Sequence, residues 1–254
     1  MDNSLIINLE NHRSRERIKD MGEVFTPEQY VQQMLGMFDE KIWTDENVIF
    51  FEPSCGHGNI ALPILGKRIS ALTRKYTKAK IDRPVFYGVA NALNTLWAID
   101  ICPENIDLTR KRIFDSILRT LEAETYGIHQ AKTRNFLTHV LCTLIWQIHE
   151  NEALSSLSVE ANAYAQASKT KLGADWFKTN KHRQINFKMD WCEHYMQSVN
   201  QNIVPIIYQR ALRFMEGATE IEKIRGFEEF NFAREVIQFA TERRNTKTTR
   251  AGNA

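Results

Sequence analysis

The feature that most restricts the fold of this chain is a short run of β-forming residues leading directly into a glycine-containing loop. Residues 47–51 (NVIFF) are predicted to form a buried strand, and Pro53, Gly56 and Gly58 follow it. A helix is predicted from about residue 60 to residue 76. Because glycine has no Cβ, such a loop can turn sharply and approach a ligand closely. A purely structural tight turn explains the two glycines equally well.

A second predicted strand, residues 96–101, carries Asp100 near its end, and Pro103 opens the next predicted helix. Alternating strands and helices indicate an α/β fold with a mainly parallel sheet flanked by helices. In nucleoside-binding α/β folds, a carboxylate at the end of the second strand accepts hydrogen bonds from ribose hydroxyls. In the alternative interpretation, Asp100 caps the helix that begins near Pro103.

The remaining segments give weaker patterns. Residues 77–93 are predicted to be an insertion with a short helix, and residues 143–148 a third strand. We expect a polar, basic N-terminal arm at 1–21, a cofactor-binding domain at 22–157, and a mostly helical extension at 158–243. The extension would complete the domain or bind a substrate or partner, and residues 244–254 would form a disordered basic tail.

Composition and motif spacing argue against several function classes. The net charge of +2 provides no global field that would attract nucleic acid, so any DNA contact requires a local patch. The four cysteines form no CxxC pair, which argues against a disulfide framework, and Cys192, Glu193 and His194 lack a second ligand pair for a metal. Neither a signal peptide nor a membrane-spanning run is found, so we expect a cytoplasmic protein without metal or membrane contacts.

Two common nucleotide sites also fit poorly. No GxxxxGK[ST] sequence is present, which argues against a P-loop. Asp100 lies 42 residues after Gly58, whereas a dinucleotide-binding unit places its acid about 20 residues on. A nicotinamide cofactor is therefore disfavoured.

Three ordered segments resemble motifs of the adenine-N6 DNA methyltransferases, as found in type I and type II modification subunits. These segments are residues 22–27 (GEVFTP), 51–59 (FEPSCGHGN) and 97–105 (WAIDICPEN). The resemblance covers roughly residues 20 to 120, and the three motifs together are far more specific than any one of them. It implies a Rossmann-like methyltransferase fold that binds S-adenosylmethionine.

The resemblance also implies roles for individual residues. Phe25, Thr26 and Pro27 would line the cofactor pocket, and Asp100 would bind the ribose, with Ile101 packing on the adenine ring. The loop that holds the methionine part of the cofactor would include Glu52, Pro53, Ser54, Gly56 and Gly58.

The chain departs from the family at the catalytic signature. Members that methylate an exocyclic amine carry an Asn or Asp, two prolines and an aromatic residue, but this sequence contains no Pro-Pro pair. Residues 202–208 (NIVPIIY) could be a drifted remnant with Asn202 or Tyr208 in the catalytic role, although a chance helix-start proline explains them better. Glu152 and Asp190 are further candidates, Asp190 having the alternative of a helix cap beside a buried Trp191.

Three hypotheses for the function follow. The first is a methyltransferase that acts on adenine in DNA, in a restriction-modification system or a phage. The second is a degenerate homologue that binds S-adenosylmethionine without turnover and acts as a partner subunit or an antagonist of a modification system. The third is a methyltransferase for RNA, protein or a small molecule, because the cofactor half of such a fold does not determine the substrate.

Overall fold

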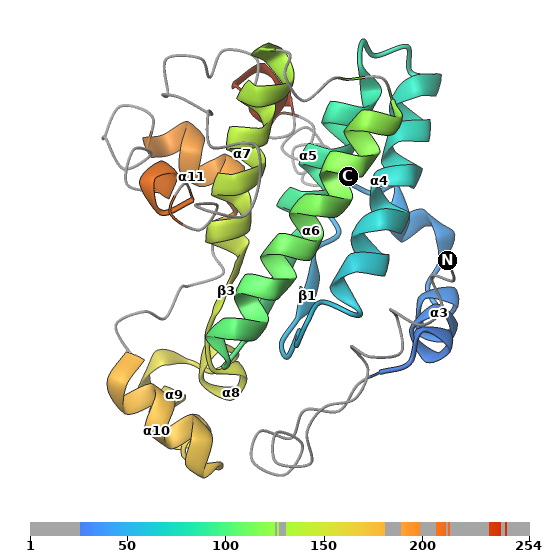
Figure 1. Cartoon of the computed structure of the whole chain (residues 1–254). Coiled ribbons are helices and arrows are strands. Elements are labelled where there is room, and N and C mark those ends of the chain that lie inside the picture. Colours follow the sequence, from blue (N-terminus) through green and yellow to red (C-terminus); the bar gives the residue numbers. More distant parts are fainter. Residues whose placement is uncertain are drawn as a thin grey trace, which may run out of the picture.

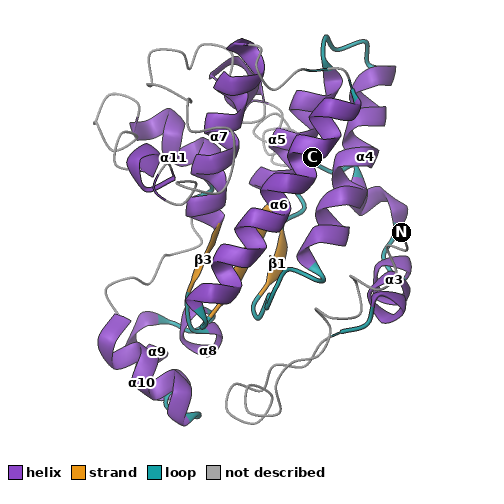
Figure 2. Ribbon diagram, viewed as in Figure 1, coloured by secondary structure: helices purple, strands orange, loops and turns teal. Residues whose placement is uncertain are grey.

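The computed structural model describes residues 26–124, 126, 131–180, 189–198, 207–211, 213, 234–239 and 242. Within these residues the architecture is α/β, with a small open parallel sheet and a large share of helix (Figure 1, Figure 2). The expected α/β class with a parallel sheet is therefore confirmed. The strands are β1 (Phe50–Glu52), β2 (Leu96–Asp100) and β3 (Ile148–Glu150), in the order β1-β2-β3.

The central strand β2 pairs with both neighbours. Phe51 of β1 is in register with Trp97, and His149 of β3 is in register with Ile99. Every residue of β2 is buried, as expected for a strand that is covered on both faces. Because all strands are parallel, their carboxyl ends meet at one edge of the sheet, where α/β folds bind ligands.

Two long helices follow the first two strands, as predicted. They are α4 (Ala61–Lys78) after β1 and α6 (Pro103–Ala123) after β2, and both are labelled in Figure 1. Pro103 occupies the first turn of α6, where its missing N–H costs no hydrogen bond. Both helices bury an apolar face in the main core, with Leu65 and Leu72 contributed by α4 and Ile113 and Ile117 by α6.

The segment expected to be an insertion is part of the main core. It contains α5 (Pro84–Asn94), which packs along α4 and buries nearly all its residues. Gly88 makes the close approach possible, since a Cβ there would lie 2.4 Å from Thr73 Oγ1. All of residues 89–94 (VANALN) are buried, so this part of the helix serves core packing.

The predicted third strand at residues 143–148 is wrong in extent. Residues up to Gln147 belong to α7 (Ala131–Gln147), which runs directly into β3. The apolar residues Phe136, Val140 and Leu144 recur at helical spacing and are buried. The Thr143 hydroxyl donates to the His139 carbonyl oxygen at 2.9 Å, a bond available only within a helix.

The chain before β1 is anchored to α4. It contains α3 (Glu28–Gly36) and the short η1 (Glu40–Trp43), where Trp43 stacks on Phe50 with ring centroids 5.2 Å apart. Arg68 of α4 is completely buried and donates to the carbonyl oxygens of Ile42 and Asp45, both at 2.7 Å. These hydrogen bonds pair Nη1 of the buried guanidinium and hold the segment against the helix.

Short helices lie at both ends of the sheet (Figure 1). At the carboxyl ends of the strands the chain forms α8 (Ala153–Ser156), η2 (Glu160–Asn162), α9 (Ala163–Ala167) and α10 (Lys171–Asn180). Near α7, at the other end, lies α11 (Trp191–Ser198). Among the described residues, no helix combines the length and apolar character needed to cross a membrane.

Candidate functional site

The loop between β1 and α4 has a backbone that requires its two glycines. Gly56 and Gly58 have φ values of +51° and +81°, in the left-handed region that other residues rarely adopt. A Cβ on Gly58 would also lie 2.6 Å from Leu62 Cδ1 and 3.0 Å from Thr109 Cγ2. Residues 53–60, called the glycine loop below, therefore form a tight turn directly beyond the carboxyl end of β1.

Asp100 ties the glycine loop to the end of β2. Its Oδ2 accepts a hydrogen bond from the Gly56 backbone N–H at 2.9 Å. Its Oδ1 accepts from the Cys102 backbone N–H at 2.9 Å and from Asn105 Nδ2 at 3.1 Å. Asp100 therefore orders both the glycine loop and the turn that enters α6, although it does not cap a backbone N–H within that helix.

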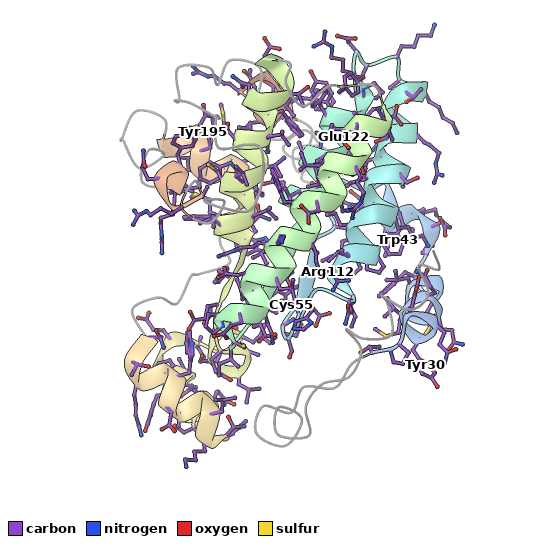
Figure 3. The ribbon with its side chains drawn as sticks, in the orientation of Figure 1. Tyr30, Trp43, Cys55, Arg112, Glu122 and Tyr195 are labelled. Carbon is purple, nitrogen blue, oxygen red and sulfur yellow. The ribbon has the colours of Figure 1, made fainter. Side chains whose placement is uncertain are left out.

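Two side chains of α6 fix the glycine loop from the other side. Thr109 Oγ1 donates to the Gly56 carbonyl oxygen at 2.8 Å. Arg112 Nη1 donates to the His57 carbonyl oxygen at 2.5 Å and to Asn59 Oδ1 at 2.9 Å, and Figure 3 labels Arg112 on α6. We did not single out these residues from the sequence. Asn105, Thr109 and Arg112 follow one another at spacings of four and three residues, which places all three on one face of a helix. This spacing was the sequence signal that could have identified them.

Glu52 provides a second carboxylate at this edge of the sheet. It ends β1, and its Oε1 accepts from the Ser54 backbone N–H at 3.4 Å. Burial raises the pKa of Glu52 above its ordinary value, and the nearby Asp100 charge acts in the same direction. Two neighbouring acids at a ligand-binding edge favour a ligand that carries positive charge or hydrogen-bond donors.

The helices after β3 cover part of the same edge. Trp176 of α10 donates from Nε1 to Glu150 Oε1 at 2.7 Å, which ties these helices to the end of β3. Ile101, expected to contact an adenine ring, packs against a small apolar cluster of Ala163, Ala167, Trp176 and Phe177. The side chain is only partly buried, so some of its surface remains open.

Glu152 lies at this edge but already has a structural role. Its carboxylate caps α8, accepting from the backbone N–H groups of Leu154 at 3.1 Å and Ser155 at 2.7 Å. The side chain is 5% exposed. The structure therefore brings Glu152 near the glycine-loop edge while directing its oxygens to the helix start.

Asp190 lies at the opposite end of the sheet from the glycine loop. Its Oδ1 caps α11 by accepting from the Glu193 backbone N–H at 2.9 Å. The adjoining Cys192 N–H donates at 3.2 Å to Asn94, the last residue of α5, which precedes the amino end of β2. Because this location is far from the carboxyl ends of the strands, Asp190 matches the capping alternative, and we do not retain it as a catalytic candidate.

The other candidates have simpler placements. Tyr208 is buried in the main core. Asn202 and Phe25 lie outside the described residues. Thr26 and Pro27 immediately precede α3, whose N-cap is Pro27. In the described part of the chain, no hydrogen bond joins Thr26 or Pro27 to the glycine loop.

The described cysteines and histidines form no metal site, and Cys55 is not activated as a nucleophile. No group of three or more His, Cys, Asp or Glu side chains there could hold a metal ion. Cys55 is buried beside Asp100, and burial raises the pKa of its thiol, so it is a poor nucleophile at neutral pH.

No protein-family model, curated protein or solved structure matches this chain significantly. Arguments about its function therefore depend on the chemistry of the glycine loop and the strand ends.

Proposed function

We propose that this chain is an S-adenosylmethionine-dependent methyltransferase that acts on adenine-N6 of DNA, as part of a restriction-modification system or a phage. The observation that carries the proposal is the hydrogen bond between Asp100 and the Gly56 amide, which joins the glycine loop to the end of the neighbouring parallel strand. This arrangement is compatible with a Rossmann-like methyltransferase fold, and it lies where such folds bind nucleosides. The corresponding place of action is the cytoplasm of a bacterium or phage-infected cell.

The residues at the strand ends fit the chemical groups of this cofactor. An ionised carboxylate has about four acceptor positions, and Asp100 uses three of them, which leaves one on Oδ2 for a ribose hydroxyl. Glu52 would face the positive charge of the methionine part of the cofactor. The amino end of α4 would favour the carboxylate of that methionine part. When bound, S-adenosylmethionine supplies an activated methyl group on a positively charged sulfur.

Preorganisation of the glycine loop also supports this proposal. Gly56 is held through its N–H by Asp100 and through its carbonyl oxygen by Thr109, and Arg112 holds the carbonyl oxygen of His57. A loop that is ordered in this way loses little conformational entropy when it binds a ligand. Thr26, Pro27, Pro53, Ser54, Gly58 and Ile101 complete the proposed cofactor site.

A second candidate function is a catalytically degenerate homologue that binds the cofactor and acts as a partner subunit or an antagonist of a modification system. The observation that favours it is the occupation of Glu152, whose two carboxylate oxygens cap α8. With Asp190 at the other end of the sheet and Tyr208 in the core, no described candidate presents a base-binding group beside the glycine loop.

Transfer of labelled methyl groups distinguishes the two functions. The purified chain is incubated with methyl-labelled S-adenosylmethionine and either unmodified DNA or the same DNA already methylated at adenine-N6. Label in the unmodified DNA alone supports adenine methylation. Cofactor binding without transfer to DNA, RNA or protein supports the degenerate homologue, whereas label in RNA or protein alone overturns the choice of DNA.

A further inference from the structure

A second surface of the molecule has an unusual charge pattern. Helix α4 contains five basic residues and no acidic one. Four of these, Lys67, Arg74, Lys75 and Lys78, recur at spacings that place them on one side of the helix, and we call this set the α4 basic face. At about 1.5 Å per residue, they extend over about 16 Å of the helix axis.

Half of the α4 basic face is already paired with carboxylates. Lys67 Nζ lies 3.2 Å from Glu40 Oε1, and Lys75 Nζ lies 2.5 Å from the buried Glu46 Oε1. Arg74 and Lys78 are exposed, and neither makes an ion pair within the part of the chain that the structure describes. Two cations are therefore available for an external anion.

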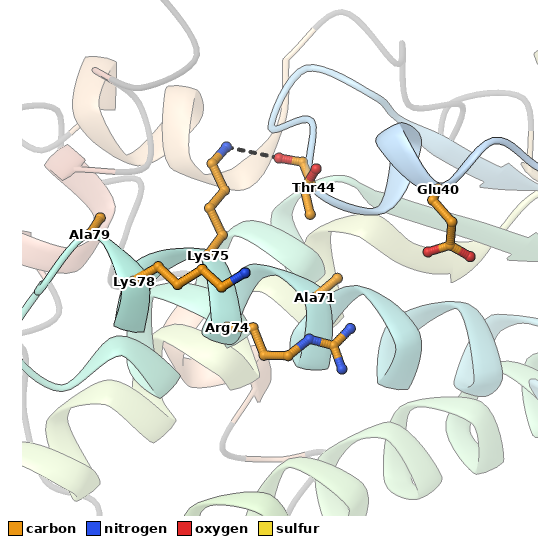
Figure 4. Close-up of a pocket in the computed structure, with 7 residues that line it drawn as sticks. All are labelled: Glu40, Thr44, Ala71, Arg74, Lys75, Lys78 and Ala79. Carbon is orange, nitrogen blue, oxygen red and sulfur yellow. Dashed lines mark hydrogen bonds between the residues drawn. The ribbon is translucent and has the colours of Figure 1, made fainter.

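These side chains border a hollow of about 560 Å³ between α4 and η1 (Figure 4). Arg74, Lys75 and Lys78 line it together with the small side chains Ala71 and Ala79. Glu40 and Thr44 lie on the η1 side, and Lys75 Nζ donates to the Thr44 carbonyl oxygen at 2.9 Å. Three basic side chains line the hollow and Glu40 is the only acid in its lining, so its charge favours a phosphate group.

We propose that the α4 basic face binds the phosphate backbone of duplex DNA, with Arg74 and Lys78 as the main contacts. Along one strand, successive base pairs advance about 3.4 Å, so the face matches about five base-pair steps. Such contacts position DNA without reading its sequence. The choice of DNA over other polyanions rests on the proposed function, but the binding itself requires no cofactor.

The position of the face explains how a chain with a net charge of only +2 binds DNA, since its cations are gathered locally. The hollow lies on the second half of α4, whereas the glycine loop precedes the first residue of that helix. A duplex held along α4 would therefore extend from the hollow toward the glycine loop.

The test measures binding of a fluorescent duplex of about 20 base pairs, about two helical turns, by anisotropy at several salt concentrations without cofactor. The double variant R74Q/K78Q should bind about tenfold more weakly, and its salt dependence should decrease by about two phosphate contacts. The matched control, K111Q/R119Q, removes one Lys and one Arg that are exposed on α6 and should bind as the wild type does.

A variant of opposite sign completes the experiment. Glu40→Gln removes the acid from the hollow and should strengthen DNA binding by about two- to threefold, which misfolding could not produce. Unchanged binding by R74Q/K78Q, or equal loss in both double variants, would overturn the proposal. Binding to a polyphosphate or an acidic protein with no affinity for DNA would overturn the choice of partner. Methyl transfer is measured separately, so failure of the enzymatic proposal and failure of this surface give different results.

Discussion

The Asp100 carboxylate and the Gly56 backbone amide, 44 positions apart in the sequence, are joined by a hydrogen bond of 2.9 Å. This bond connects the loop after the first strand to the end of the second strand. Thr109 donates to the Gly56 carbonyl oxygen, so both the N–H and the carbonyl oxygen of Gly56 are held by side chains. The same carboxylate therefore supports the local structure and provides the acceptor for a bound ribose in our proposal.

Replacing Asp100 with Asn should destabilise the fold. The introduced NH2 group would face an N–H donor, so at least one buried hydrogen bond to a charged acceptor is lost, at a cost of about 2 to 3 kcal/mol. Urea unfolding measures this change. Asp175→Asn on the exposed side of α10 is the control and should cost no more than about 0.5 kcal/mol, because only an exposed pair with Lys178 is weakened. Equal stability of both variants would contradict the role assigned to Asp100.

Two glycine substitutions should have opposite effects. Gly58→Ala should lower the free energy of unfolding by about 1 to 2 kcal/mol, because its φ of +81° is unfavourable for alanine and the methyl group would meet Leu62. Gly66 lies inside α4, and a methyl group added there would have nothing within 4 Å. Gly66→Ala should therefore raise the free energy of unfolding by about 0.5 to 1 kcal/mol. If Gly58→Ala is as stable as Gly66→Ala, the described loop conformation is wrong.

The first half of the fold was predictable because local signals agreed with each other there. Glu52 and Asp100 each end an apolar run that forms a strand, and a proline or glycine follows closely. Pro103 marks the start of the next helix. The third strand was misplaced because residues 143–147 are rich in β-formers although they continue a buried helix. Its actual length, three residues, is too short for periodicity to locate.

The candidate site was only partly predictable. Asp100 and the two glycines stand out in the sequence, whereas Thr109 and Arg112 act through contacts more than 50 positions away. For Asp190 the sequence favoured a helix cap over a catalytic role, and the tertiary structure places it as a cap at the opposite end of the sheet. Side chains that work through distant backbone groups leave little local signal.

The buried His139 should make stability depend on pH. Its Nδ1 accepts from Trp191 Nε1 at 3.0 Å, and complete burial lowers the pKa of His139 to about 3. The unfolded chain binds a proton near pH 6.5 and the folded chain does not, so stability is lost as the pH falls below that value. Between pH 7.5 and 5.5 this histidine should reduce the free energy of unfolding by about 1.4 kcal/mol.

His139→Gln provides the comparison for this prediction, because its side-chain oxygen can still accept from Trp191. Urea unfolding of both proteins at the two pH values separates the contribution of His139 from that of other titrating groups. The variant should lose less stability on acidification than the wild type. The same pH dependence in both proteins would show that His139 is protonated in the folded state.

Calorimetric titration of the purified chain with S-adenosylmethionine, and separately with its demethylated product, tests the central claim most directly. We predict micromolar binding of both compounds at a single site, and weaker binding by the Thr109→Val variant, which removes the hydroxyl that holds the Gly56 carbonyl oxygen. Thr120→Val is the matched control, since its hydroxyl bonds only within α6. No binding by the folded wild-type protein would contradict the account and leave the glycine loop as a structural turn.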